Sequence, residues 1–234
     1  MSFNDFLAGY KADELEEVRK VQTVGTDFSE LMRKYERLLD EPTPYLDEMI
    51  NTSYRDEMIL IFSHFHKITT ILTPAEINSF LQTTQQYADH RYYHRTGLVI
   101  SSLINNSYSS GYNGFSINTT EDLPRINFVM NNIIGKETNP LLISVQGNIG
   151  YYVGYRTQYS AFSFNGSVGE CGDEAQNSTF LFNGEAGLCS GRGAKNCTFK
   201  TPIWRNIEKL KKSLPEDNTL IYIDQGKEVK IDFE

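Results

Sequence analysis

The sequence predicts an α+β protein, with an N-terminal helical region, then a right-handed β-solenoid (β-helix) of about five coils, then a C-terminal helix and hairpin. Three observations predict this class. Only two of the 17 glycines, Gly9 and Gly25, lie before residue 96, as is typical of helical sequence. Residues 96–202 are rich in glycine, asparagine and aromatic residues, and they contain a repeat of 18 to 19 residues. The expected units are therefore 1–95, 96–202 and 203–234.

The helical region contains three patterns that predict helices. Apolar residues recur with helical spacing over 28–39, at Phe28, Leu31, Met32, Tyr35, Leu38 and Leu39. A second helix is expected over 54–70, where Met58, Ile61 and Phe65 are among the apolar residues. A capping box from Thr73 to Glu76, with proline at the first helical position, predicts a third helix that runs to about His94. Together these patterns indicate a bundle of about four helices.

The repeat aligns aromatic residues and glycines. Phe162, Phe180 and Phe199 stand 18 and 19 residues apart, and Ile143 precedes them by another 19. Each of three copies then has two turn glycines in the pattern G-x-x-G, followed by a third: Gly147, Gly150 and Gly154; Gly166, Gly169 and Gly172; Gly184, Gly187 and Gly191. A chain that returns to one face after each copy forms stacked coils about 4.8 Å apart, the spacing of paired strands.

Stacked coils place identical residues in ladders. The three phenylalanines should form an inner aromatic stack, while Gln146, Asn165 and Asn183 could link their amides from coil to coil. Weaker copies are expected upstream, at Leu98–Ile100, at Phe115 with Ile117, and at Ile126 with Phe128. Exposed strand edges at the two ends need covers, which the helical region and residues 203–214 should supply.

The glycine pattern G-x-x-G-x(2,3)-G resembles the GxGxG β-helix that occurs in the C-terminal domain of glutamate synthase and in one of the subunits of formylmethanofuran dehydrogenase. The similarity covers roughly residues 140–202. It implies a rigid structural element within a larger enzyme, and it transfers no catalytic residue. The helical region has no counterpart in those families, and the amidotransferase and flavin-binding parts of glutamate synthase are absent from this sequence.

Charge and composition exclude several classes of partner. The 234 residues carry a net charge of −8, with a pI near 5.1 and no dense block of lysine and arginine. Nucleic acid and anionic membrane surfaces are therefore not expected as partners. The N-terminal sequence has acidic residues where a signal peptide needs basic and apolar ones, and no apolar run could span a bilayer. The protein is expected to be cytoplasmic.

Histidine and cysteine are the candidates for metal or thiol chemistry. His90 and His94 have the i, i+4 spacing that can place two imidazoles on one metal, although the glutamate of the H-E-x-x-H motif is missing. Cys171 and Cys189 should stack on adjacent coils, close enough for a disulfide, but free packed thiols are expected in the cytoplasm. Surface or hydrogen-bonded histidines are the favoured interpretation, and no cofactor is predicted.

The function expected from these residues is a non-catalytic scaffold that presents its coils to a protein partner. The alternative is a carbohydrate-active or other small-molecule enzyme that uses the solenoid face, for which several converging carboxylates would be needed. Glu170 and Asp173 could be neighbours, but no ladder of acidic residues forms. Four tyrosines could stack on sugars or pack against the helical region: Tyr151, Tyr152, Tyr155 and Tyr159.

Overall fold

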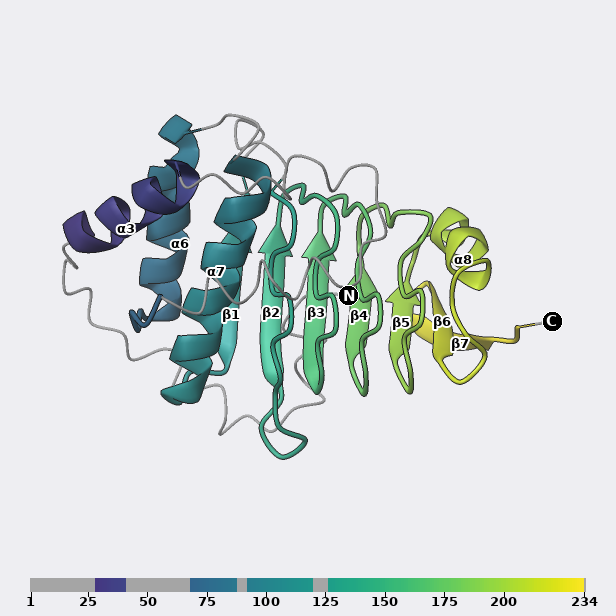
Figure 1. Ribbon diagram of the computed structural model, residues 1–234. Coiled ribbons are helices and arrows are strands. Elements are labelled where there is room, and N and C mark those ends of the chain that lie inside the picture. The colour runs from purple at the N-terminus through teal and green to yellow at the C-terminus, as the bar shows by residue number, and fades with distance from the viewer. Residues whose placement is uncertain (1–27, 41–67, 88–91, 120–125, 234) are drawn as a thin grey trace.

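A computed structural model describes residues 28–40, 68–87, 92–119 and 126–233. The fold class is confirmed: helices at the N-terminal end are followed by a parallel β-solenoid of about four turns and by a C-terminal helix and hairpin. Figure 1 shows the strands side by side, with the helices α3 (Ser29–Asp40), α6 (Pro74–Thr83) and α7 (Tyr92–Ser109) at one end and helix α8 (Trp204–Lys211) with the last two strands at the other. One sheet contains seven strands in sequence order: β1 (Gly114–Asn118), β2 (Leu141–Gln146), β3 (Ser160–Asn165), β4 (Thr179–Phe182), β5 (Thr198–Thr201), β6 (Thr219–Asp224) and β7 (Lys227–Ile231).

The N-terminal helices cover the outer edge of β1. Helix α6 (Pro74–Thr83) begins at the expected capping box, in which the Thr73 hydroxyl accepts from the Glu76 N–H and the Glu76 carboxylate accepts from the Thr73 N–H. The helix contacts β1, where Asn78 accepts from the Asn118 N–H at 2.9 Å. The N-terminal cover of the solenoid therefore consists of hydrogen bonds to the strand edge as well as apolar packing.

The helix expected over 28–39 is α3 (Ser29–Asp40), which buries one face at Leu31, Tyr35 and Leu39. Its Tyr35 hydroxyl hydrogen-bonds the hydroxyl of Thr96 in α7 (Tyr92–Ser109) at 2.7 Å. The helix expected over 54–70 lies outside the described residues as far as residue 67, and residues 68–70 are not helical.

Two expectations for this region are wrong. Helix α6 ends at Thr83 instead of about His94, because Thr83 and Thr84 donate back to the carbonyls of Phe80 and Leu81 at 2.7 Å, and a 3₁₀ turn follows (η2, Thr84–Tyr87). Residues 98–100 belong to α7 and not to a coil, so the solenoid has about four turns instead of the expected five.

The upstream repeat is partly confirmed. Phe115 and Ile117 lie in β1, in register with Ile143 and Val145 of β2. Ile126, in contrast, does not begin a coil of its own. Its carbonyl accepts from the Gly150 N–H, so this segment forms the turn side of the first coil.

The parallel register places one apolar ladder inside the solenoid. Phe162 pairs with Phe180, and Phe180 pairs with Phe199. Their rings are stacked with centroids 4.9 Å apart at each step and interplanar angles of 6° and 15°. The same row continues to Ile143 on one side and to Leu220 on the other. All of these side chains are fully buried, so the ladder is the solenoid core.

Glycines form three rows on the turns of the coils. The first row contains Gly147, Gly166 and Gly184, and the second contains Gly150, Gly169 and Gly187. Successive backbones in these rows touch, since a Cβ on Gly187 would lie 1.7 Å from the carbonyl oxygen of Gly169. In the third row the constraint is different, because Gly172 has φ +70° and a Cβ there would meet the ring of Phe180 at 2.8 Å.

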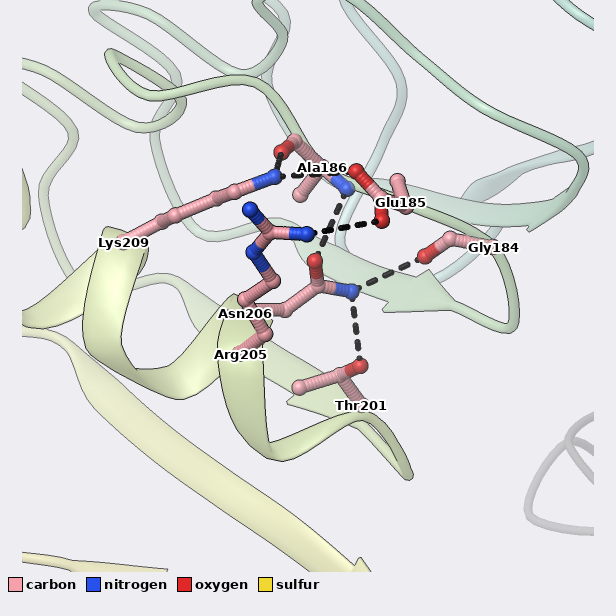
Figure 2. A network of polar contacts seen from close by, with 7 residues as sticks. All are labelled: Gly184, Glu185, Ala186, Thr201, Arg205, Asn206 and Lys209. Carbon is pink, nitrogen blue, oxygen red and sulfur yellow. Dashed lines mark hydrogen bonds and ion pairs between the residues drawn. The ribbon is translucent and has the colours of Figure 1, made fainter.

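At the C-terminal end, helix α8 (Trp204–Lys211) replaces the turn side of a further coil, and β6 then joins β5 in parallel. Figure 2 shows how Asn206, which is 1% exposed, binds the last coil. Its Oδ1 accepts from the Ala186 N–H at 3.0 Å, and its Nδ2 donates to the Gly184 carbonyl at 2.9 Å and to the Thr201 hydroxyl at 3.0 Å. A side-chain amide thus satisfies backbone groups that a next coil would otherwise bind.

Asn218 does the same further along this edge. It accepts from the Cys197 N–H at 2.9 Å and donates to the Ala194 carbonyl at 2.9 Å. Between the two asparagines, the Ser213 hydroxyl donates to the Ser190 carbonyl at 2.7 Å. Residues 203–218 are therefore a cover whose polar side chains match the solenoid edge.

Candidate functional site

A groove crosses the turn side of successive coils, on a side of the solenoid that carries charged residues. Its volume is about 640 Å³. We call it the charged groove, and its charged lining consists of Arg156, Asp173, Glu174, Arg192 and Lys195. The lining also includes Gln158, Gln176 and Tyr155.

One row of the groove is set by backbone pairing between coils. Parallel bridges join Gln158 to Gln176 and Gln176 to Lys195, and a further bridge joins Ile134 to Gln158. Their side chains therefore stand at equivalent positions on adjacent coils, about 4.8 Å apart along the solenoid. The row offers two amides and one ammonium group to a ligand that lies across the coils.

A second row contains an ion pair between coils. The Arg156 Nε donates to the Glu174 carboxylate at 2.8 Å, and the guanidinium carbon lies 4.9 Å from the centre of the Tyr155 ring. The bond to Glu174 raises the pKa of Arg156, so the guanidinium stays charged. Arg156 and Glu174 both have positive φ, 56° and 54°, because the turn repeats the same left-handed position on each coil.

Asp173 lies beneath this surface, paired with a cation from the next coil. The carboxylate is only 3% exposed, and its Oδ2 accepts from an Arg192 guanidinium nitrogen at 3.1 Å. Its Oδ1 is buried without a hydrogen bond among the described residues. The pKa of Asp173 is raised to about 7, chiefly by burial; Glu170 adds to the increase, and Arg192 offsets part of it. Arg192 itself is 63% exposed and reaches into the groove.

Asp173 is expected to make the protein less stable as the pH rises from about 4 to about 7. Over this range the folded state keeps the Asp173 proton, whereas the unfolded chain, with the usual pKa of 3.8, has released it. The folded state then binds more protons, so the free energy of unfolding falls with pH by on the order of 3 kcal/mol and levels off above pH 7. Urea unfolding between pH 4 and 8 measures this slope.

The matched control for this slope is Asp173→Asn, which cannot titrate. The variant keeps every other titrating group, including all four histidines. Between pH 4 and pH 8, its free energy of unfolding should fall less with rising pH than that of the wild type. Identical slopes for the two proteins would contradict a raised pKa at Asp173.

The amide contact expected between coils links Asn183 to Asn165 but does not extend to Gln146, and Cys171 lies opposite Ser190 instead of Cys189. Asn183 Nδ2 donates to Asn165 Oδ1 at 2.7 Å, but Gln146 donates to Ser144 in its own strand. Cys171 does not stack on Cys189. Its N–H donates to Ser190 Oγ and its carbonyl accepts from the Gly191 N–H. The coil that contains Cys189 therefore has one more residue at this turn than the coil that contains Cys171.

All three cysteines are free thiols. Burial raises the pKa of Cys171 well above its ordinary value and that of Cys197 to about 11. Burial also raises the pKa of Cys189, and nearby Glu170 adds to that effect. These thiols therefore stay protonated at neutral pH, which disfavours nucleophilic chemistry.

The histidines and tyrosines are not gathered at one site in the described residues. His90 lies outside them, while His94 is in α7, with its ring 5.2 Å from that of Phe128. The ring of Tyr152 also stacks on Phe128, with the two ring centres 5.1 Å apart, whereas Tyr151 is exposed. Within residues 28–40, 68–87, 92–119 and 126–233, no group of three His, Cys, Asp or Glu side chains could hold a metal ion.

The sequence did contain a signal for the charged groove. Gln158, Gln176 and Lys195 are separated by 18 and 19 residues, the same spacing as the phenylalanine ladder. Asp173 and Arg192 are likewise 19 residues apart. Applying the repeat to its charged positions, in addition to its glycines, would have placed these side chains next to one another.

Comparison with protein families, with curated proteins and with solved structures finds no match to this chain. Among the helices in the described part of the chain, none is long and apolar enough to cross a membrane.

Proposed function

We propose that this protein is a non-catalytic binding scaffold, built on a β-solenoid, whose charged groove holds an extended acidic segment of a partner protein. The observation that carries the proposal is the local charge. The groove is lined by three cationic side chains and two carboxylates, although the chain as a whole has a net charge of −8. Because Arg156 and Arg192 are paired with Glu174 and Asp173, the excess positive charge of the groove is that of Lys195, and a carboxylate of a ligand would complement it.

The available hydrogen-bonding groups support the same ligand class. Lys195 has no ion pair among the described residues, and Arg192 is mostly exposed while one of its nitrogens binds Asp173. An arginine can bind a carboxylate through its remaining donors. Gln158 and Gln176 add amides that can pair with the backbone of an extended chain.

The glycine pattern also supports a scaffold. Its resemblance to the GxGxG β-helix of glutamate synthase and formylmethanofuran dehydrogenase implies a rigid element that positions other parts of an assembly. Ring stacking and backbone contact between coils would hold the charged rows at fixed spacing, which lowers the entropic cost of binding. We place the scaffold in the cytoplasm, with no cofactor.

Binding of a labelled peptide tests the proposal. A short peptide that alternates glutamate and serine should bind the full chain, as measured by fluorescence polarization, and a matched lysine and serine peptide should not. Added salt should weaken the complex. The double variant Arg192→Gln/Lys195→Gln should lose at least about tenfold in affinity.

The control is Lys211→Gln/Lys212→Gln, which makes the same change in net charge on exposed residues at the end of α8. Equal affinities for the two double variants would contradict the proposed site, as would no binding of the acidic peptide. An acidic oligosaccharide, oligogalacturonate, serves as the competing ligand class. Its binding or cleavage in place of peptide binding would favour the carbohydrate-active alternative.

A further inference from the structure

The outer edge of β7 has no neighbouring strand in the described part of the chain. The sheet runs in order from β1 to β7, so β7 is its last member. Four of the five β7 residues are exposed. An unpaired edge presents backbone donors and acceptors that another strand can bind. This edge shares no residue with the charged groove.

The geometry of the β6–β7 hairpin determines which residues face outward. Asp224 and Lys227 close it around the two-residue loop Gln225–Gly226, in which φ is 48° and 83°. The closing pair of such a hairpin exchanges both backbone hydrogen bonds, and bonded and non-bonded pairs then alternate along the ladder. The backbone N–H and C=O groups of Glu228 and Lys230 consequently point away from β6.

Glu228 and Lys230 are the outward-facing residues of β7, and one of their antiparallel pairings with a second copy brings opposite charges together. Outward-facing residues must lie opposite each other to exchange hydrogen bonds. Pairing Glu228 with its own copy, or Lys230 with its own copy, places like charges opposite, which is destabilising. Pairing Glu228 with Lys230 gives two attractive pairs related by a twofold axis, and it places the half-exposed Val229 of each copy at that axis.

We propose that β7 pairs with β7 of a second copy of this chain, antiparallel about a twofold axis at Val229, with Glu228 of each copy opposite Lys230 of the other. The contact is isologous, as in most homodimers. It joins the two sheets into one and removes both free edges. The Lys200 ammonium already binds Glu228 at 2.7 Å, and it would stand on the same side of the sheet as the new charge pairs.

Charge reversal with mixing tests this interface. Sedimentation velocity over a range of concentrations should show a reversible dimer of the full wild-type chain. Glu228→Lys and Lys230→Glu should each be monomeric, with dimerisation weakened at least about tenfold, because each places like charges opposite. An equal mixture of the two variants should form a heterodimer, since the charges are then complementary.

The mixture separates an interface effect from a folding defect, because two misfolded variants do not restore each other. A third variant, Lys230→Pro, removes an outward donor and should also be monomeric, whereas Lys211→Glu in α8 should dimerise like the wild type. A wild-type chain that stays monomeric at all concentrations overturns the proposal and leaves the edge to a strand from another protein. Dimers that persist in the single variants, or a mixture that fails to associate, also overturn it.

Discussion

Gly187→Ala is expected to lower the free energy of unfolding by at least about 3 kcal/mol, because the new methyl group has no space. Its Cβ would lie 1.7 Å from the Gly169 carbonyl oxygen and 2.4 Å from the carbonyl carbon. Both atoms belong to the backbone of the adjacent coil, so the clash can be relieved only by separating the coils. Thermal unfolding should then occur at least about 6 °C lower than in the wild type.

Gly193→Ala is the control for this substitution. Gly193 also lies on a turn and has φ +69°, but the atom nearest to a Cβ there is the Glu174 Cγ at 3.5 Å. The change therefore costs only the backbone strain of a left-handed alanine, about 1 kcal/mol. If the two alanine variants lost equal stability, close contact between the glycine rows would not be the reason for their presence.

Asn206→Ala is expected to cost about 3 kcal/mol and to loosen the C-terminal end of the solenoid. The substitution leaves the Ala186 N–H and the Gly184 carbonyl without their partner in a buried position (Figure 2). An unpaired buried polar group costs about 1–3 kcal/mol. Hydrogen exchange should report faster exchange at Ala186 and in α8, and urea unfolding should give the loss of stability.

Arg205→Ala changes the preceding residue of the same helix and should have little effect. Its guanidinium lies 3.8 Å from the Glu185 carboxylate, and the two side chains are 74% and 55% exposed. Such pairs contribute less than about 1 kcal/mol. A loss at Arg205 as large as that at Asn206 would mean that surface charge, and not the buried amide, fixes α8 to the solenoid.

The main architecture could be predicted because the features that produce it are periodic. Phe162, Phe180 and Phe199 occupy equivalent strand positions, so their spacing already contains the register. The capping box at Thr73 likewise marks a helix start through local hydrogen bonds alone. Periodic and local signals of this kind can be read without knowing which distant segments meet.

Residues 98–100 do not form the expected coil, because their sequence has no period to distinguish a strand from a helix. Leu98, Val99 and Ile100 are buried on consecutive positions of α7. A helix that is apolar on all sides gives the same short run as a buried strand. The helix also passes very close to another segment, since a Cβ on Gly97 would lie 1.7 Å from the Asn127 carbonyl oxygen, and this contact depends on tertiary structure.

The details of the site were missed for a different reason. A single extra residue between Gly187 and Gly191, relative to Gly169 and Gly172, shifts Cys189 out of line with Cys171. The charged pairs of the groove still follow the repeat, since Asp173 and Arg192 are 19 residues apart, so they are found once the repeat is applied to charged positions. Composition alone gives the number of charges but not the coil to which each belongs.

Each coil of the solenoid touches mainly the coil before it and the coil after it, as the stacked phenylalanine rings illustrate. In the described residues, the N-terminal cover binds β1 and the turn side of the first coil, and the C-terminal cover binds the last turns of the stack. A block of 18 or 19 residues could therefore be added between β3 and β4, or removed there, while both covers keep their contacts. The number of coils therefore determines the length of the binding surface. Each added coil would lengthen it by about 4.8 Å, so the protein could bind a longer ligand without a change of fold.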